Sequence, residues 1–63
     1  MSNNRTLGQI AFEAYGDNRA WKDWRGLPMP AWSEVRPEIR SAWDVAASAV
    51  AYAVVKDLEH RMP

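Results

Sequence analysis

Apolar residues recur with helical spacing in two stretches of this chain, and the first stretch lies near the amino terminus. Its apolar positions follow the i, i+3, i+4, i+7 spacing of one helical face: Leu7, Ile10, Ala11 and Ala14. Thr6 and Gln9 before and within this stretch have the form of a capping box, because the hydroxyl can accept from an early helical N–H while the amide reaches back. Gly16 follows the stripe, where glycine is the expected left-handed terminator. The pattern predicts a short helix over residues 7–15.

The second apolar stretch is longer and begins at Pro37, whose missing N–H costs nothing in the first turn of a helix. Glu38 places negative charge at the positive end of the helix dipole. The apolar positions keep a repeat of nearly 3.5 residues: Ile39, Ala42, Trp43, Ala46, Ala47, Val50, Ala53, Val54 and Leu58. Since neither glycine nor proline interrupts the repeat before Pro63, we expect a helix over residues 37–61 and an all-α fold.

The segment between the two helices contains Gly26, Pro28 and Pro30, which is too much punctuation for another long helix. About twenty residues without regular structure are unusual inside a small domain. We therefore expect a structured loop, rich in Trp and Pro, that its tryptophans hold against the helices. The chain as a whole, residues 1–63, is expected to form one small helical domain with a disordered tail at residues 1–5.

The two expected helices differ in length, which predicts self-association. A helix of about 24 residues spans about 36 Å, whereas one of about 10 residues covers about 15 Å. The distal half of the long helix, from Val50 to Leu58, must therefore be covered either by the Trp-rich loop or by another copy of the protein. Five alanines favour the second alternative, since short side chains let two helices approach closely: Ala46, Ala47, Ala49, Ala51 and Ala53. We expect a homodimer or a larger ring built on the helix 37–61.

Composition narrows the function classes. Eight basic and eight acidic residues cancel, so the chain has no global field that would draw it to nucleic acid or to an acidic membrane. Small domains are often stabilised by disulfides or by a structural metal. With no cysteine and one histidine, both are almost excluded here. The apolar runs are broken before they reach membrane-spanning length, and no leader pattern is present. These features predict a cytoplasmic protein with no membrane partner and make nucleic acid an unlikely one.

Catalysis finds little support among the polar residues. His60 lies in the last turn of the second expected helix, where a cation near the negative end of the dipole is the simpler explanation. No serine has a base at motif spacing, and the carboxylates show no spacing that commits two of them to one site. The sequence predicts a non-enzymatic protein without catalytic residues, metal or cofactor.

Cations alternate with aromatic rings at the start of the loop, and this is the strongest candidate for chemistry. Point charges and guanidinium groups hold phosphates while a flat group stacks on an indole. We expect a ligand-binding site formed by Arg19, Trp21, Lys22, Trp24 and Arg25, with the Tyr15 hydroxyl lining it. The alternative for each tryptophan is a packing role, which is strongest for Trp43 on the second helix. Trp21 or Trp24 is the tryptophan expected to be partly exposed.

Three runs of the sequence resemble short proteins of tailed phages and prophages: Ala11–Tyr15 (AFEAY), Arg25–Trp32 (RGLPMPAW) and Glu38–Trp43 (EIRSAW). The likeness covers residues 7–50. Its most specific part is Met29–Trp32 (MPAW), which ends eleven residues before Trp43. The order of helix, loop, Pro-x-Pro strap and helix also resembles, more remotely, the Ry repeat of ryanodine receptors, from which the alanine-rich second helix departs.

The phage resemblance implies an accessory protein of the bacterial host cytoplasm that acts against host defence. Such proteins either sequester a nucleotide signal in an oligomer or occlude a host protein. The loop chemistry favours the first, because cations alternating with indoles suit a flat, anionic, nucleotide-like ligand. The alternative is a protein-binding module or inhibitor that uses the long helix or the Pro-Met-Pro strap. A third interpretation, binding of single-stranded nucleic acid, predicts affinity that falls steeply with salt.

Overall fold

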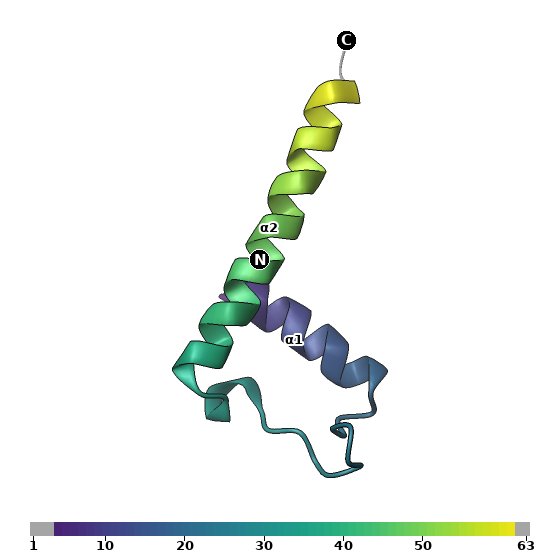
Figure 1. Ribbon diagram of the computed structural model, residues 1–63, viewed down its shortest axis with the longest axis vertical. Helices are drawn as coiled ribbons and strands as arrows, with labels where there is room; N and C mark the ends of the chain where they lie inside the picture. Colours follow the sequence, from purple (N-terminus) through teal and green to yellow (C-terminus); the bar gives the residue numbers. More distant parts are fainter. Residues whose placement is uncertain (1–3, 62–63) are drawn as a thin grey trace.

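The computed structural model describes residues 4–61 and contains two helices joined by a long loop (Figure 1). Helix α1 spans Leu7–Asn18, a single 3-10 turn η1 spans Trp32–Glu34, and helix α2 spans Pro37–Arg61. Residues 4–61 hold no β-strand, only one isolated antiparallel bridge in the loop. The predicted all-α fold and the predicted bounds of the second helix are therefore confirmed.

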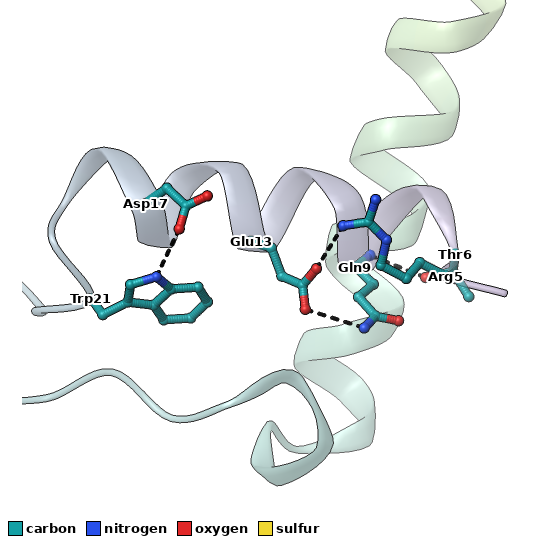
Figure 2. Close-up of polar contacts among 6 residues, drawn as sticks. All are labelled: Arg5, Thr6, Gln9, Glu13, Asp17 and Trp21. Carbon is teal, nitrogen blue, oxygen red and sulfur yellow. Dashed lines mark hydrogen bonds and ion pairs between the residues drawn. The ribbon is translucent and has the colours of Figure 1, made fainter. Parts of the chain in front are cut away.

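The start of α1 confirms the threonine cap but not the full capping box. The Thr6 hydroxyl oxygen accepts from the backbone N–H of Gln9 at 3.1 Å. The Gln9 side chain does not reach back; its amide donates forward to Glu13 Oε2 at 3.2 Å, as Figure 2 shows. Arg5 donates to the other oxygen of Glu13 at 2.9 Å. Arg5 thus belongs to the ordered start of α1, whereas residues 1–3 of the expected disordered tail lie outside the described residues.

The end of α1 corrects the expected terminator, because Gly16 is buried inside the helix, which continues to Asn18. The helix ends instead in a Schellman arrangement, in which the N–H of Trp21 donates to the Gly16 carbonyl at 2.8 Å and that of Ala20 to Asp17 at 3.3 Å. Ala20 takes the left-handed conformation, with φ of 55°. Gly16 is needed for a close approach instead: a Cβ there would lie 2.8 Å from the Trp21 ring.

Phe12 is the centre of the core. It is 5% exposed, and Val35 is the other buried apolar residue among those described. Three indoles surround the Phe12 ring, with centroids 6.1 Å away for Trp21, 5.5 Å for Trp32 and 5.5 Å for Trp43. One ring of α1 thereby joins the beginning of the loop, its end and α2. The expectation that tryptophans pin the loop to the helices is confirmed.

The helices cross where α1 begins. The backbone N–H of Gly8 donates to Asp44 Oδ1 on α2 at 2.8 Å, and a Cβ at Gly8 would lie 2.8 Å from the Asp44 Cα. Glycine is thus required there because the two backbones nearly touch. In Figure 1, α1 lies against the first half of α2, and the distal half projects away from α1 and the loop.

The distal half of α2 is uncovered. The large side chains along it are exposed: Val50, Tyr52, Val54, Val55 and Leu58. The loop joins the far end of α1 to the start of α2 and does not fold along this half (Figure 1). The expectation that the Trp-rich loop covers the distal half is therefore wrong.

Candidate functional site

A short rigid turn presents the candidate site residues of the loop. The bridge between Lys22 and Pro28 closes its base. Asp23 organises the turn, because its Oδ1 accepts from the backbone N–H groups of Arg25 at 2.8 Å and Leu27 at 3.0 Å. The N–H of Asp23 in turn donates to the Leu27 carbonyl at 2.7 Å. The tip of the loop is consequently held in one conformation by its own hydrogen bonds.

Trp24 stands on this tip and is 85% exposed, in agreement with the expectation that Trp21 or Trp24 would face solvent. The guanidinium carbon of Arg25 lies 5.7 Å from the Trp24 ring centroid, within the range of a cation–π contact. An indole that is almost entirely exposed leaves its surface available to a flat partner. The Arg25 guanidinium over the ring adds a charge that an anionic partner can pair with.

Arg25 is already engaged by a carboxylate. Its Nη2 lies 2.8 Å from Asp23 Oδ2, and its Nε donates to the same oxygen at 3.2 Å. The Arg25 guanidinium is the main cause that lowers the pKa of Asp23, with the backbone donors of the turn adding to it against the effect of desolvation. A ligand phosphate at Arg25 must therefore compete with Asp23 or share the guanidinium fork with it.

Trp21 is placed differently from Trp24. Its ring is half-buried, lies over Gly16 and packs edge-on against Phe12. Its indole N–H donates to Asp17 Oδ1 at 2.8 Å, as Figure 2 shows. The structure thus gives Trp21 a packing role, and its stacking role stays a prediction.

The remaining predicted residues lie around the end of α1. Arg19 is the exposed C-cap residue of α1, and Lys22 is exposed at the base of the turn. Tyr15, one helical turn before Arg19, is 45% exposed, and its ring lies 5.7 Å from that of Trp43. Residues at this spacing share a helix face. The structure therefore gathers five predicted residues in one segment, 19–25, and places Tyr15 on the adjoining end of α1.

Two open surface pockets lie elsewhere, on α2. The first, of about 330 Å³, is lined by Thr6, Trp32, Pro37, Arg40, Ser41 and Asp44. The second, of about 270 Å³, is lined by Ile39, Ala42, Trp43 and Ala46 and is almost entirely apolar. None of the six predicted site residues lines either pocket. The second pocket was not predicted, because these apolar positions were expected to serve helix packing, although their spacing places them on one side of the helix.

Two further classes of site are absent from the described part of the chain. Residues 4–61 contain no group of three His, Cys, Asp or Glu side chains that could hold a metal ion. Within the same residues, neither helix has the length and apolar character needed to cross a membrane.

Comparison of the chain with protein-family models, with curated proteins and with solved structures finds no match in any of the three. The features that bear on function are therefore the exposed indole of Trp24, the cations beside it and the uncovered distal half of α2.

Proposed function

We propose that this protein is a non-enzymatic accessory protein of phage type that binds, and thereby sequesters, a small anionic, nucleotide-like ligand in the cytoplasm of a bacterial host. The observation that carries the proposal is Trp24, an indole 85% exposed on a rigid turn with the Arg25 guanidinium 5.7 Å from its ring. Stacking supplies recognition of a flat base, and the cations supply recognition of phosphate. Arg19 and Lys22 add exposed positive charge on the same segment.

The strength of these contacts implies that one chain supplies only part of the site. Stacking of one base on an indole contributes about 1–3 kcal/mol. A dissociation constant of about 1 µM requires about 8 kcal/mol. Ligand sites also bury most of the ligand, whereas Trp24 at the loop tip is 85% exposed and lines neither of the two pockets. We therefore propose that the chain self-associates through α2 and that another copy in the oligomer completes the site.

The test is a titration with cyclic and linear nucleotides, read by tryptophan fluorescence and by the melting temperature. A ligand that binds the folded state raises the melting temperature, and one that stacks on Trp24 changes its emission. We expect Trp24→Ala to abolish binding and Arg25→Gln to weaken it by about tenfold or more, since hydrogen bonds to charged groups contribute about 1.5–3 kcal/mol. Arg61→Gln is the matched control, because it removes an exposed arginine at the far end of α2.

Two outcomes would contradict the proposal. The first is a nucleotide panel that changes neither the emission nor the melting temperature. The second is binding that survives Trp24→Ala and falls steeply with salt, which would indicate a nucleic-acid backbone as the partner.

A second candidate function rests on a different observation, the uncovered distal half of α2. An exposed helix with Val50, Val54 and Leu58 along it suits a helix-in-groove contact with a host protein. The exposed prolines of the strap, Pro28 and Pro30, offer a second surface of the same class. Under this candidate, Arg25→Gln leaves capture of the host protein intact, whereas Val54→Asp abolishes it. The reverse pattern supports ligand binding at the loop.

A further inference from the structure

The folded chain has more surface than its size requires. A compact protein of 7.2 kDa exposes about 4,100 Å², whereas this one exposes 5276 Å². Its radius of gyration is 14.3 Å, against about 11 Å for a compact chain of this length. The excess of about 1,200 Å² is larger than the roughly 800 Å² that each partner buries in a standard protein–protein interface. The fold therefore has the area of one side of an interface still exposed.

The exposed area includes a complete side of α2. The half-buried residues of this helix recur on the side facing α1: Arg40, Trp43, Asp44, Ala47 and Ala51. Another row, spaced four, three and four residues apart, is exposed: Ala42, Ala46, Ala49 and Ala53. We call this row, with Ile39, Val45 and Val50 at its edges, the alanine face. From residue 45 to 55 the helix carries no charged side chain in any direction, which is typical of a buried helix.

We infer that a second copy of this chain covers the alanine face, with the two α2 helices antiparallel about a two-fold axis between residues 47 and 48. The inference deepens the self-association proposed above and rests on it, but not on the ligand. It specifies which side of α2 meets the second copy and in which direction the helices run.

The spacing of the alanines fits this symmetry. A two-fold axis between residues 47 and 48 places Ala42 opposite Ala53 of the second copy and Ala46 opposite its Ala49. Short side chains then face each other along the contact, so the helices can approach to about 8 Å, the short end of the usual range. The same patch serves both copies, as an isologous dimer interface requires.

The charges at the two ends of the alanine face favour the antiparallel direction. Glu38 and Lys56 are 18 residues apart, which is five whole turns, so both lie on the same side of α2. The antiparallel pairing brings Glu38 within about one residue of Lys56 of the second copy, at both ends of the interface. The parallel pairing places Glu38 against Glu38 and Lys56 against Lys56, so like charges repel.

The apolar pocket on α2 supplies a third, independent fit. It is lined by Ile39, Ala42, Trp43 and Ala46 and opens at the edge of the alanine face. In the antiparallel pair this pocket lies opposite Val50 and Ala53 of the second copy. Val50 is 64% exposed in the single chain, and its side chain suits a small apolar pocket. Each copy thereby fills the pocket of the other.

The chain has no cysteine, so introduced cysteines report the direction directly. We would prepare Ala42→Cys and Ala53→Cys separately, label one variant with a mass tag, mix them and oxidise the mixture under non-denaturing conditions. The antiparallel pair brings position 42 of one chain against position 53 of the other, near the Cα separation of about 6 Å that a disulfide needs. We expect disulfides between unlike variants to predominate and each variant alone to remain unlinked. Self-linking of each variant, which indicates a parallel pair, would overturn the inference.

A second measurement tests the face without oxidation. The unmodified chain should sediment as a multiple of the 7.2 kDa chain mass, and Ala49→Arg should reduce the mass to that of one chain. Ser48→Arg is the matched control, because Ser48 is exposed but points away from the alanine face. A single-chain mass for the unmodified protein, or equal dissociation by both arginine variants, would contradict the inference. Failure of ligand binding would be seen only in the nucleotide titration, which leaves these results unchanged.

Discussion

The two ends of α2 are held by different forces. At its start, Trp43 packs against Phe12, and Asp44 accepts a hydrogen bond from the α1 backbone. In its distal half, the side-chain contacts lie within the helix itself: ion pairs between Lys56 and Glu59 at 3.4 Å and between Asp57 and Arg61 at 3.1 Å, and Lys56 over the ring of Tyr52. Exposed pairs of this kind contribute little, and isolated helices are marginal in water. The difference is that the aromatic end packs against its own chain, whereas the distal half is exposed and makes no contact with the rest of the described residues that would hold it.

The largest expected effect is that of Phe12→Ala, which removes the centre of the aromatic end. Removing the ring that three indoles contact should cost about 3–5 kcal/mol, which is most of the stability expected of a chain this small. We expect loss of the cooperative transition in chemical denaturation followed by circular dichroism. Leu58→Ala is the control in the distal half, and it should change the free energy of unfolding by less than about 0.5 kcal/mol. Equal costs for the two variants would show that the distal half is packed as tightly as the aromatic end.

The helix crossing is tested by Gly8→Ala. A methyl group there meets the Asp44 backbone, which cannot rotate away, so the helices must separate. We expect a loss of about 1–3 kcal/mol from overpacking, even though alanine is the better helix former by about 1 kcal/mol. Gly26→Ala separates a clash from backbone strain, because the added methyl meets open space while φ remains at 79°. Stabilisation by Gly8→Ala in thermal denaturation would mean that the crossing is looser than described.

The Schellman end of α1 predicts a stabilising change. Ala20 holds a left-handed φ of 55°, which costs an alanine about 1–2 kcal/mol. Ala20→Gly removes that strain and loses part of the gain to the greater freedom of glycine in the unfolded chain. We expect a net gain of about 0.5–1 kcal/mol in chemical denaturation. Ala14→Gly, within α1, is the control and should lose about 1 kcal/mol. A lower free energy of unfolding for both variants would show that Ala20 is not strained.

Exchanging the charges at the two ends of the alanine face should have a smaller effect, on the stability of the dimer. Glu38→Lys or Lys56→Glu alone should weaken the dimer, and the double exchange should restore it, because both pairs are then re-formed in reverse. Each exposed pair contributes about 0.2–1 kcal/mol, so the dissociation constant should change by about twofold to thirtyfold for two pairs. Sedimentation equilibrium at low salt measures it. An effect of the double exchange equal to the sum of the single ones would argue against antiparallel helices.

The smallest effect is expected from acid. The hydrogen bond from Arg5 is the main cause that lowers the pKa of Glu13 below its ordinary value of 4.5, and Gln9 adds to it. Because the folded state favours the carboxylate, its stabilisation is present above the ordinary pKa and is lost as the pH falls through the lowered one. The melting temperature should therefore decline below about pH 4.5, and Arg5→Gln should make that decline shallower. An unchanged acid profile in Arg5→Gln would show that the contact has no effect on stability.

Local signals in the sequence were sufficient for the helices but not for their ends. The bounds of α2 were predicted correctly because Pro37 favours a helix start and neither glycine nor proline follows it up to Arg61. The end of α1 was predicted wrongly, because Gly16 was expected to end the helix. It lies inside the helix, where the lack of a side chain leaves room for the Trp21 ring. One of Trp21 and Trp24 was correctly expected at the surface, yet the alternation of rings and cations did not show which, since a cation follows each of them in the sequence.

Periodicity, prolines and the mismatch in helix length were enough to indicate two helices, a loop and an uncovered distal half, because these properties depend on residues near each other in the chain. The roles of the individual tryptophans depended on which rings meet Phe12 in space, and those of Gly8 and Gly16 on the close approach of Asp44 and of the Trp21 ring. These roles follow from contacts between distant segments, where a single ring position decides which side chain is buried and which is left for a ligand. The order of the residues therefore indicated that α1 is too short to cover α2, whereas the fold shows which side chains of α2 are exposed.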